Sequence, residues 1–102
     1  MAIKAITQQQ FDRYSPARTP MIQMIAEEKA WFSDDAMNII GTILFDKSDM
    51  DWNWVMLGRD PKGSFRAIDT EASFKTQEEA EKSLKAAMSK VEASGESVFE
   101  QD

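Results

Sequence analysis

The sequence predicts a single α+β domain with an N-terminal helical segment, an antiparallel β-meander of three or four strands, and a C-terminal helix packed on one sheet face. Its 102 residues are the size of one domain, and 42% of them are apolar. Short β-branched and aromatic runs separated by polar turns predict the strands, and a later apolar repeat at helical spacing predicts the final helix. We expect residues 1–95 to form the domain and residues 96–102 a flexible acidic tail.

The N-terminal part of the chain carries two helix-start signals. Thr7 and Gln10 have the spacing of a capping box, which predicts a short helix over residues 8–14. Thr19-Pro20 then places a capping threonine before a proline at the first helical position. We expect the second helix to reach about Glu28.

The middle of the chain predicts a meander. Residues 29–33 either continue the second helix or form a first strand, and the turn-forming residues that follow favour a short strand. Three further strands are expected over residues 38–46, 51–58 and 64–70. Asp60-Pro61-Lys62-Gly63 has the chemistry of a type I turn closed by a left-handed glycine, which joins the last two strands as a hairpin.

The last predicted helix begins after Thr76, where Glu79 completes a second capping box. Gly95 is a suitable stop for this helix. An apolar stripe at helical spacing predicts that one helix face packs inward. The stripe consists of Ala80, Leu84, Ala87, Met88 and Val91.

Both faces of the predicted hairpin are apolar, and this is the main functional clue. If Asp60 pairs with Ser64, Leu57 lies opposite Ala67 and Met56 opposite Ile68. Because side chains alternate along a strand, two sets result. One set, which we expect beneath the final helix, contains Val55, Leu57, Phe65 and Ala67. The other set contains Trp52, Trp54, Met56, Arg66 and Ile68.

The tryptophan-bearing set needs a cover, since solvent is a poor environment for two tryptophans. The N-terminal helices are one candidate cover. The other is a protein partner or a second copy of the chain, because Trp, Met and Arg are enriched in interfaces. This second reading predicts a non-enzymatic interaction domain that forms a two-fold homodimer through this face.

The composition argues against several other classes of protein. The chain has no histidine and no cysteine, so the commonest general base and the thiolate nucleophile are both missing, and we expect no catalytic residues and no cofactor. A net charge of −6 without a basic block disfavours nucleic acid and anionic membranes. With no signal peptide or membrane span expected, a cytoplasmic location is predicted.

Two alternative functions stay open. Asp46, Asp49 and Asp51 crowd one turn and could hold a hard cation such as magnesium or calcium, in a metal-binding domain or a metal-dependent enzyme. The ordinary interpretation is a solvated turn in which aspartate bonds the local backbone, and we favour it, so no metal is assigned. Single-strand nucleic-acid binding would combine the aromatic strands with Arg59, Lys62 and Arg66.

The hairpin also resembles small bacterial proteins that share a Trp-x-x-Val-x-Leu-Gly-Arg-Asp strand followed by Phe-Arg-Ala-Ile-Asp and a helix. Here these segments are residues 52–60 and 65–69. The resemblance covers about half the chain. It implies a fold, and it implies no established activity.

Overall fold

The computed structural model describes residues 3–14 and 25–94, which form five strands and two helices. In chain order these are β1 (Lys4–Ile6), α1 (Gln8–Asp12), β2 (Ala26–Ser33), β3 (Ile39–Asp46), β4 (Asp51–Arg59), β5 (Phe65–Phe74) and α3 (Gln77–Ser94). The second predicted helix lies mostly outside the described residues, as do Gly95 and the acidic tail.

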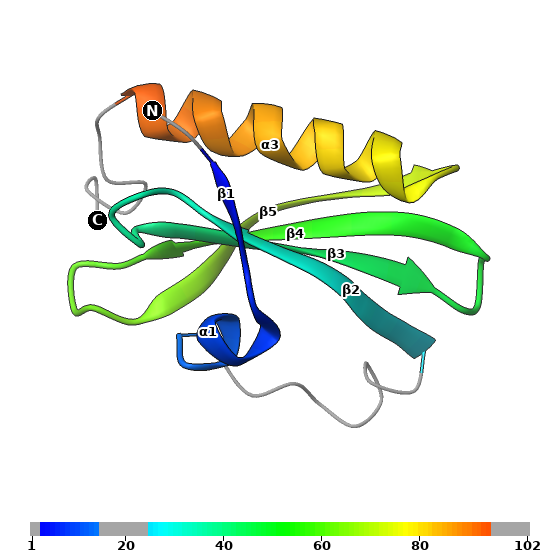
Figure 1. Cartoon of the computed structure of the whole chain (residues 1–102), viewed down its shortest axis with the longest axis horizontal. Coiled ribbons are helices and arrows are strands. Elements are labelled where there is room, and N and C mark those ends of the chain that lie inside the picture. The colour runs from blue at the N-terminus through cyan, green and yellow to red at the C-terminus, as the bar shows by residue number, and fades with distance from the viewer. Residues whose placement is uncertain (1–2, 15–24, 95–102) are drawn as a thin grey trace.

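The predicted α+β class is confirmed. All five strands pair with their chain neighbours in antiparallel fashion, in the order β1-β2-β3-β4-β5. Helix α3 lies along one face of this sheet and α1 lies on the opposite side (Figure 1). The sheet has five strands where three or four were predicted. The additional strand is β1, which is only three residues long and therefore too short to show a periodic pattern.

The ambiguous segment at residues 29–33 is a strand, and it begins earlier than predicted. Strand β2 starts at Ala26, which pairs with Asp46, so the expected extension of the second helix to Glu28 is wrong. Pairing with β3 overrides the local helical pattern here. The first helix, α1, ends at Asp12, two residues before the predicted end.

The capping predictions hold in full at α1 and in part at α3. Thr7 Oγ1 accepts from Gln10 N at 3.1 Å, and Gln10 Oε1 accepts from Thr7 N at 2.9 Å. At α3, Glu79 N donates to Thr76 Oγ1 at 3.1 Å. The Glu79 carboxylate, however, accepts from Lys75 N at 3.2 Å, which lies one residue before the predicted partner.

The turn between β4 and β5 is the predicted one. Gly63 has φ +90°, its N–H donates to Asp60 O at 2.9 Å, and Asp60 N donates to Ser64 O at 2.7 Å. Leu57 therefore lies opposite Ala67, as expected. Met56 pairs with Asp69 rather than with Ile68, because a β-bulge in β5 places one extra residue opposite β4.

The side-chain sets of the hairpin are as predicted, but the face that meets the final helix is not. Trp54 and Met56 lie beneath α3, in one cluster with Leu84 and Met88. The expectation that Val55, Leu57, Phe65 and Ala67 face α3 is therefore wrong. Gly41, opposite Met56 on β3, lets the helix approach, since a Cβ there would lie 2.9 Å from Leu84 Cδ1.

The opposite sheet face has a second, smaller apolar cluster. Phe11 of α1 is 1% exposed and packs with Ile40, Leu57 and Phe65. Half-buried side chains, among them Trp31 and Val55, border this cluster. The sheet is therefore covered on both sides around its centre, by α3 on one face and by α1 on the other.

Candidate functional site

The two central members of the predicted tryptophan-bearing surface are core residues. Trp54 is 1% exposed and Met56 is 2% exposed. The Trp54 indole Nε1–H donates to Ser83 Oγ of α3 at 3.0 Å, which satisfies its only polar atom. In the folded chain these two side chains have almost no surface with which to contact a partner.

The other three members of that set lie towards the ends of the hairpin and along β5. Trp52 is half-buried against Phe45, with ring centroids 5.0 Å apart. Ile68 is half-buried, and Arg66 is exposed with its Nε 3.4 Å from Asp60 Oδ2. The fold thus divides the predicted surface into a buried centre, formed by Trp54 and Met56, and a more accessible periphery.

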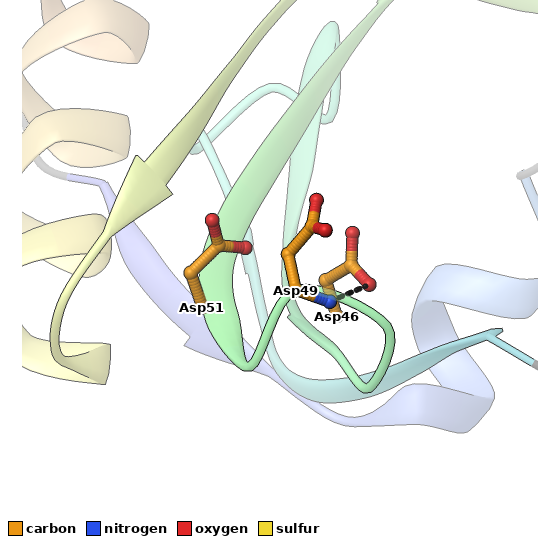
Figure 2. A group of neighbouring side chains, drawn as sticks. All are labelled: Asp46, Asp49 and Asp51. Atoms are coloured by element: carbon orange, nitrogen blue, oxygen red, sulfur yellow. Dashed lines mark hydrogen bonds between the residues drawn. The ribbon is translucent and has the colours of Figure 1, made fainter.

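The three aspartates that the sequence groups in one turn do lie together. Asp46 ends β3, Asp51 begins β4 directly opposite, and Asp49 belongs to the turn between them. One carboxylate oxygen from each residue lies within 4.8 Å of those of the other two. Figure 2 shows all three carboxylates on the same side of the turn. Such a group of oxygens resembles part of a coordination shell for a hard cation.

Asp46 also has the structural role expected of a turn aspartate. Its Oδ1 accepts from Ser48 N at 2.8 Å and from Asp49 N at 3.2 Å. The second of these bonds is drawn in Figure 2. These bonds hold the turn, so the interpretation of a solvated, self-bonded turn explains Asp46 completely. It leaves Asp49 and Asp51 without an explanation.

The electrostatics of the turn are unfavourable. Asp46 and Asp51 are directly opposed like charges, which destabilise an antiparallel pair. Among the described residues, no ion pair reaches the three carboxylates. Lys47 lies 3.8 Å from Glu27, and the hydrogen bond and charge of Lys29 lower the Glu27 pKa, with a smaller contribution from Lys47. The nearest lysine in sequence is therefore engaged with another acid.

The residues of the predicted stacking surface for nucleic acid differ in accessibility. Trp54 is enclosed beneath α3. Arg59 Nη2 donates to Met37 O at 2.9 Å, and its guanidinium lies 4.8 Å from the Phe65 ring centroid. Arg59 therefore links the β4–β5 hairpin to the loop before β3, whereas Arg66 and Lys62 are exposed.

Sequence reasoning missed one feature of functional interest, the length and exposure of β5. The strand was expected to end at residue 70, but it continues to Phe74. It forms one edge of the sheet, and seven of its ten residues are exposed. These are Arg66, Ala67, Asp69, Thr70, Glu71, Ala72 and Ser73. The polar run from Asp69 to Ser73 is the sequence signal that could have indicated an exposed edge.

No family model, curated protein or solved structure matches the chain. The resemblance of residues 52–69 to a family of small bacterial proteins therefore stays a prediction. Within the described ranges, no helix has the length and apolar character needed to cross a membrane.

Proposed function

We propose that the protein is a non-enzymatic interaction domain whose binding surface is the outer edge of β5. The observation that carries this proposal is the ten-residue strand that ends the sheet with most of its residues exposed. We prefer this edge to the tryptophan-bearing face, because α3 packs on that face and Trp54 and Met56 are buried there.

An exposed edge strand binds other strands through its main chain. Alternate N–H and C=O groups of such a strand point away from the sheet and can bond an added strand. The other edge of the sheet, β1, offers only three residues. Of the two edges, β5 is therefore the one with enough length for specific strand addition.

The register identifies groups that point outward. Asp60 N donates to Ser64 O, so residues 60 and 64 form a hydrogen-bonded pair. Antiparallel pairs alternate between bonded and non-bonded, so Ala67, opposite Leu57, directs its N–H and C=O outward. Beyond the bulge, the Thr70 N–H donates to its neighbour's carboxylate, Asp69 Oδ1, at 2.8 Å, as expected of an outward group.

A generic strand probe tests this proposal. The probe is an alternating threonine–valine peptide flanked by lysines, added to isotope-labelled protein and followed by amide chemical shifts. We expect shifts along β5 that are absent in Ala67→Pro, which removes an outward N–H and leaves the β4 ladder intact. The control is Ala72→Ser, which keeps all N–H groups. Shifts outside β5, or equal binding by Ala67→Pro, would refute the proposal.

The aspartate turn supports a second candidate function, divalent-cation binding. The supporting observation is that three carboxylate oxygens lie within 4.8 Å without an ion pair among the described residues. A cation would relieve the repulsion between Asp46 and Asp51. Titration calorimetry with calcium, magnesium and manganese tests it. Binding should disappear in Asp49→Asn and persist in Asp35→Asn, which changes an exposed aspartate of another turn. No heat with any of the three ions would remove this candidate.

A cytoplasmic location is part of the same proposal. It rests on the composition of the chain, which has no cysteine for disulfides and a net charge of −6.

A further inference from the structure

We propose that the strand added to β5 is β5 of a second copy of this chain, paired antiparallel about a two-fold axis with Arg66 opposite the partner's Glu71. This inference rests on the proposed function, because it names the partner of the same edge. Such pairing would join two five-stranded sheets into one continuous sheet.

Main-chain geometry limits the register to a few choices. In a two-fold antiparallel pair, outward-pointing residues of one strand must lie opposite outward-pointing residues of the other. Ala67 and Thr70 point outward on either side of the bulge. Ala67 opposite the partner's Thr70 satisfies this condition, and the two-fold axis then repeats the pair. The bulges of the two strands also lie opposite each other in this register.

Among the registers that the main chain permits, the charges favour the one that places Ala67 opposite the partner's Thr70. Two residues of β5 have opposite charge and equivalent positions about the axis: Arg66, one residue before Ala67, and Glu71, one after Thr70. Arg66 pairs with Gly58 and Glu71 with Trp54, so both lie on the α3 side of the sheet. Arg66 would therefore face the partner's Glu71 twice, an arrangement that stabilises cross-strand pairs.

Asp69 opposes this pairing and makes it weak. The Asp69 carboxylate accepts a hydrogen bond from the Thr70 N–H. This bond must break before the Thr70 N–H can donate to the carbonyl oxygen of the partner's Ala67. Near the axis, Asp69 would also approach the partner's Asp69. Removing this carboxylate should therefore tighten the association, whereas it would have no such effect if β5 did not self-pair.

Sedimentation equilibrium of charge-reversal variants tests the proposal. We expect the wild type to dimerise reversibly and Arg66→Glu and Glu71→Arg each to dissociate at least about tenfold more readily, because two attractive pairs become repulsive. An equimolar mixture of the two variants should form heterodimers, since at both contacts an acidic side chain of one variant then faces a basic side chain of the other. Asp69→Ala should dimerise more tightly than the wild type.

Several outcomes would overturn the proposal. If the wild type and Asp69→Ala both stay monomeric at about millimolar concentration, where even weak association is seen, β5 does not self-pair. If both single variants dimerise like the wild type, the register is wrong. Neither outcome decides whether the edge accepts other strands, because the threonine–valine peptide measures that separately. Circular dichroism of each variant confirms that it is folded.

Discussion

Strands β4 and β5 are neighbours in one hairpin and of nearly equal length, yet they differ in almost every physical respect. No residue of β4 is exposed, whereas seven of the ten in β5 are. Strand β4 pairs on both sides and lies under α3, while β5 pairs on one side only among the residues that the structure describes. The difference shows that the aromatic residues of the hairpin serve the fold, and that the accessible chemistry lies on its polar outer strand.

The largest expected effect comes from truncating the centre of β4. Trp54→Ala should reduce the free energy of unfolding by about 3–5 kcal/mol, because a fully buried aromatic leaves a cavity and Ser83 loses its donor. The matched change on β5 is Glu71→Ala, directly opposite Trp54 and exposed. It should change stability by less than about 0.5 kcal/mol. Urea denaturation measures both, and similar losses would contradict the contrast between the strands.

Substitution of two glycines, Gly41 and Gly63, should destabilise the protein for two different reasons, tight packing and backbone strain. Gly41→Val should cost about 1–3 kcal/mol, because its Cβ would meet Leu84 Cδ1 at 2.9 Å and Met88 Sδ at 3.2 Å. Gly63→Val should cost about as much for a different reason, since Gly63 has φ +90° and open space around it.

Asparagine distinguishes the two causes, because it tolerates the left-handed region. Gly63→Asn should recover most of the stability lost in Gly63→Val, and Gly41→Asn should not recover that lost in Gly41→Val. Denaturation of all four variants makes the comparison. Equal recovery at both sites would mean that backbone strain is not what distinguishes them.

The start of β4 places two like charges directly opposite each other, Asp51 and Asp46 of β3. Asp51→Asn should raise stability by about 0.2–1 kcal/mol at low salt, because it removes repulsion from Asp46 directly opposite. The gain should shrink in about 1 M salt, where charges are screened over about 3 Å. A loss of stability at low salt would mean that Asp51 has a favourable partner.

The smallest expected effect concerns Glu27, at the exposed start of β2. Lys29 donates to its carboxylate at 2.8 Å and lowers its pKa. A lowered pKa means a small stabilisation that is present above the ordinary glutamate pKa and is lost as the pH falls through the lowered value. Lys29→Ala should raise the Glu27 pKa towards its ordinary value, as followed by carboxyl NMR titration. An unchanged pKa would show that the pair does not form in solution.

Local chemistry explains what could be predicted from the sequence. Side-chain alternation on β4 and the turn at Gly63 depend on near neighbours, so the two side-chain sets and the pairing of Leu57 with Ala67 follow directly. The crowding of Asp46, Asp49 and Asp51 follows in the same way from their spacing in one turn.

The assignment of faces to helices is not local, because both side-chain sets are apolar. Gly41 was the residue in the sequence that could have indicated which face of the sheet α3 covers. A glycine within a strand often marks close approach of another element, and Gly41 lies opposite Met56, on the face that α3 covers. The bulge near Ile68 likewise depends on tertiary pairing. The exposed edge, in contrast, had a sequence signal in the mostly polar run from Asp69 to Ser73.

Amide hydrogen exchange at Ala67 tests the central claim most directly, namely that β4 is closed on both sides and β5 is open on its outer side. In dilute protein, the Ala67 N–H should exchange rapidly and the Met56 N–H slowly, because only Met56 lies in a strand paired on both sides. In concentrated protein, Ala67 should become protected while Met56 does not change. Slow exchange of Ala67 in dilute protein, at the rate of Met56, would show that the edge is already paired within the chain and would contradict this claim.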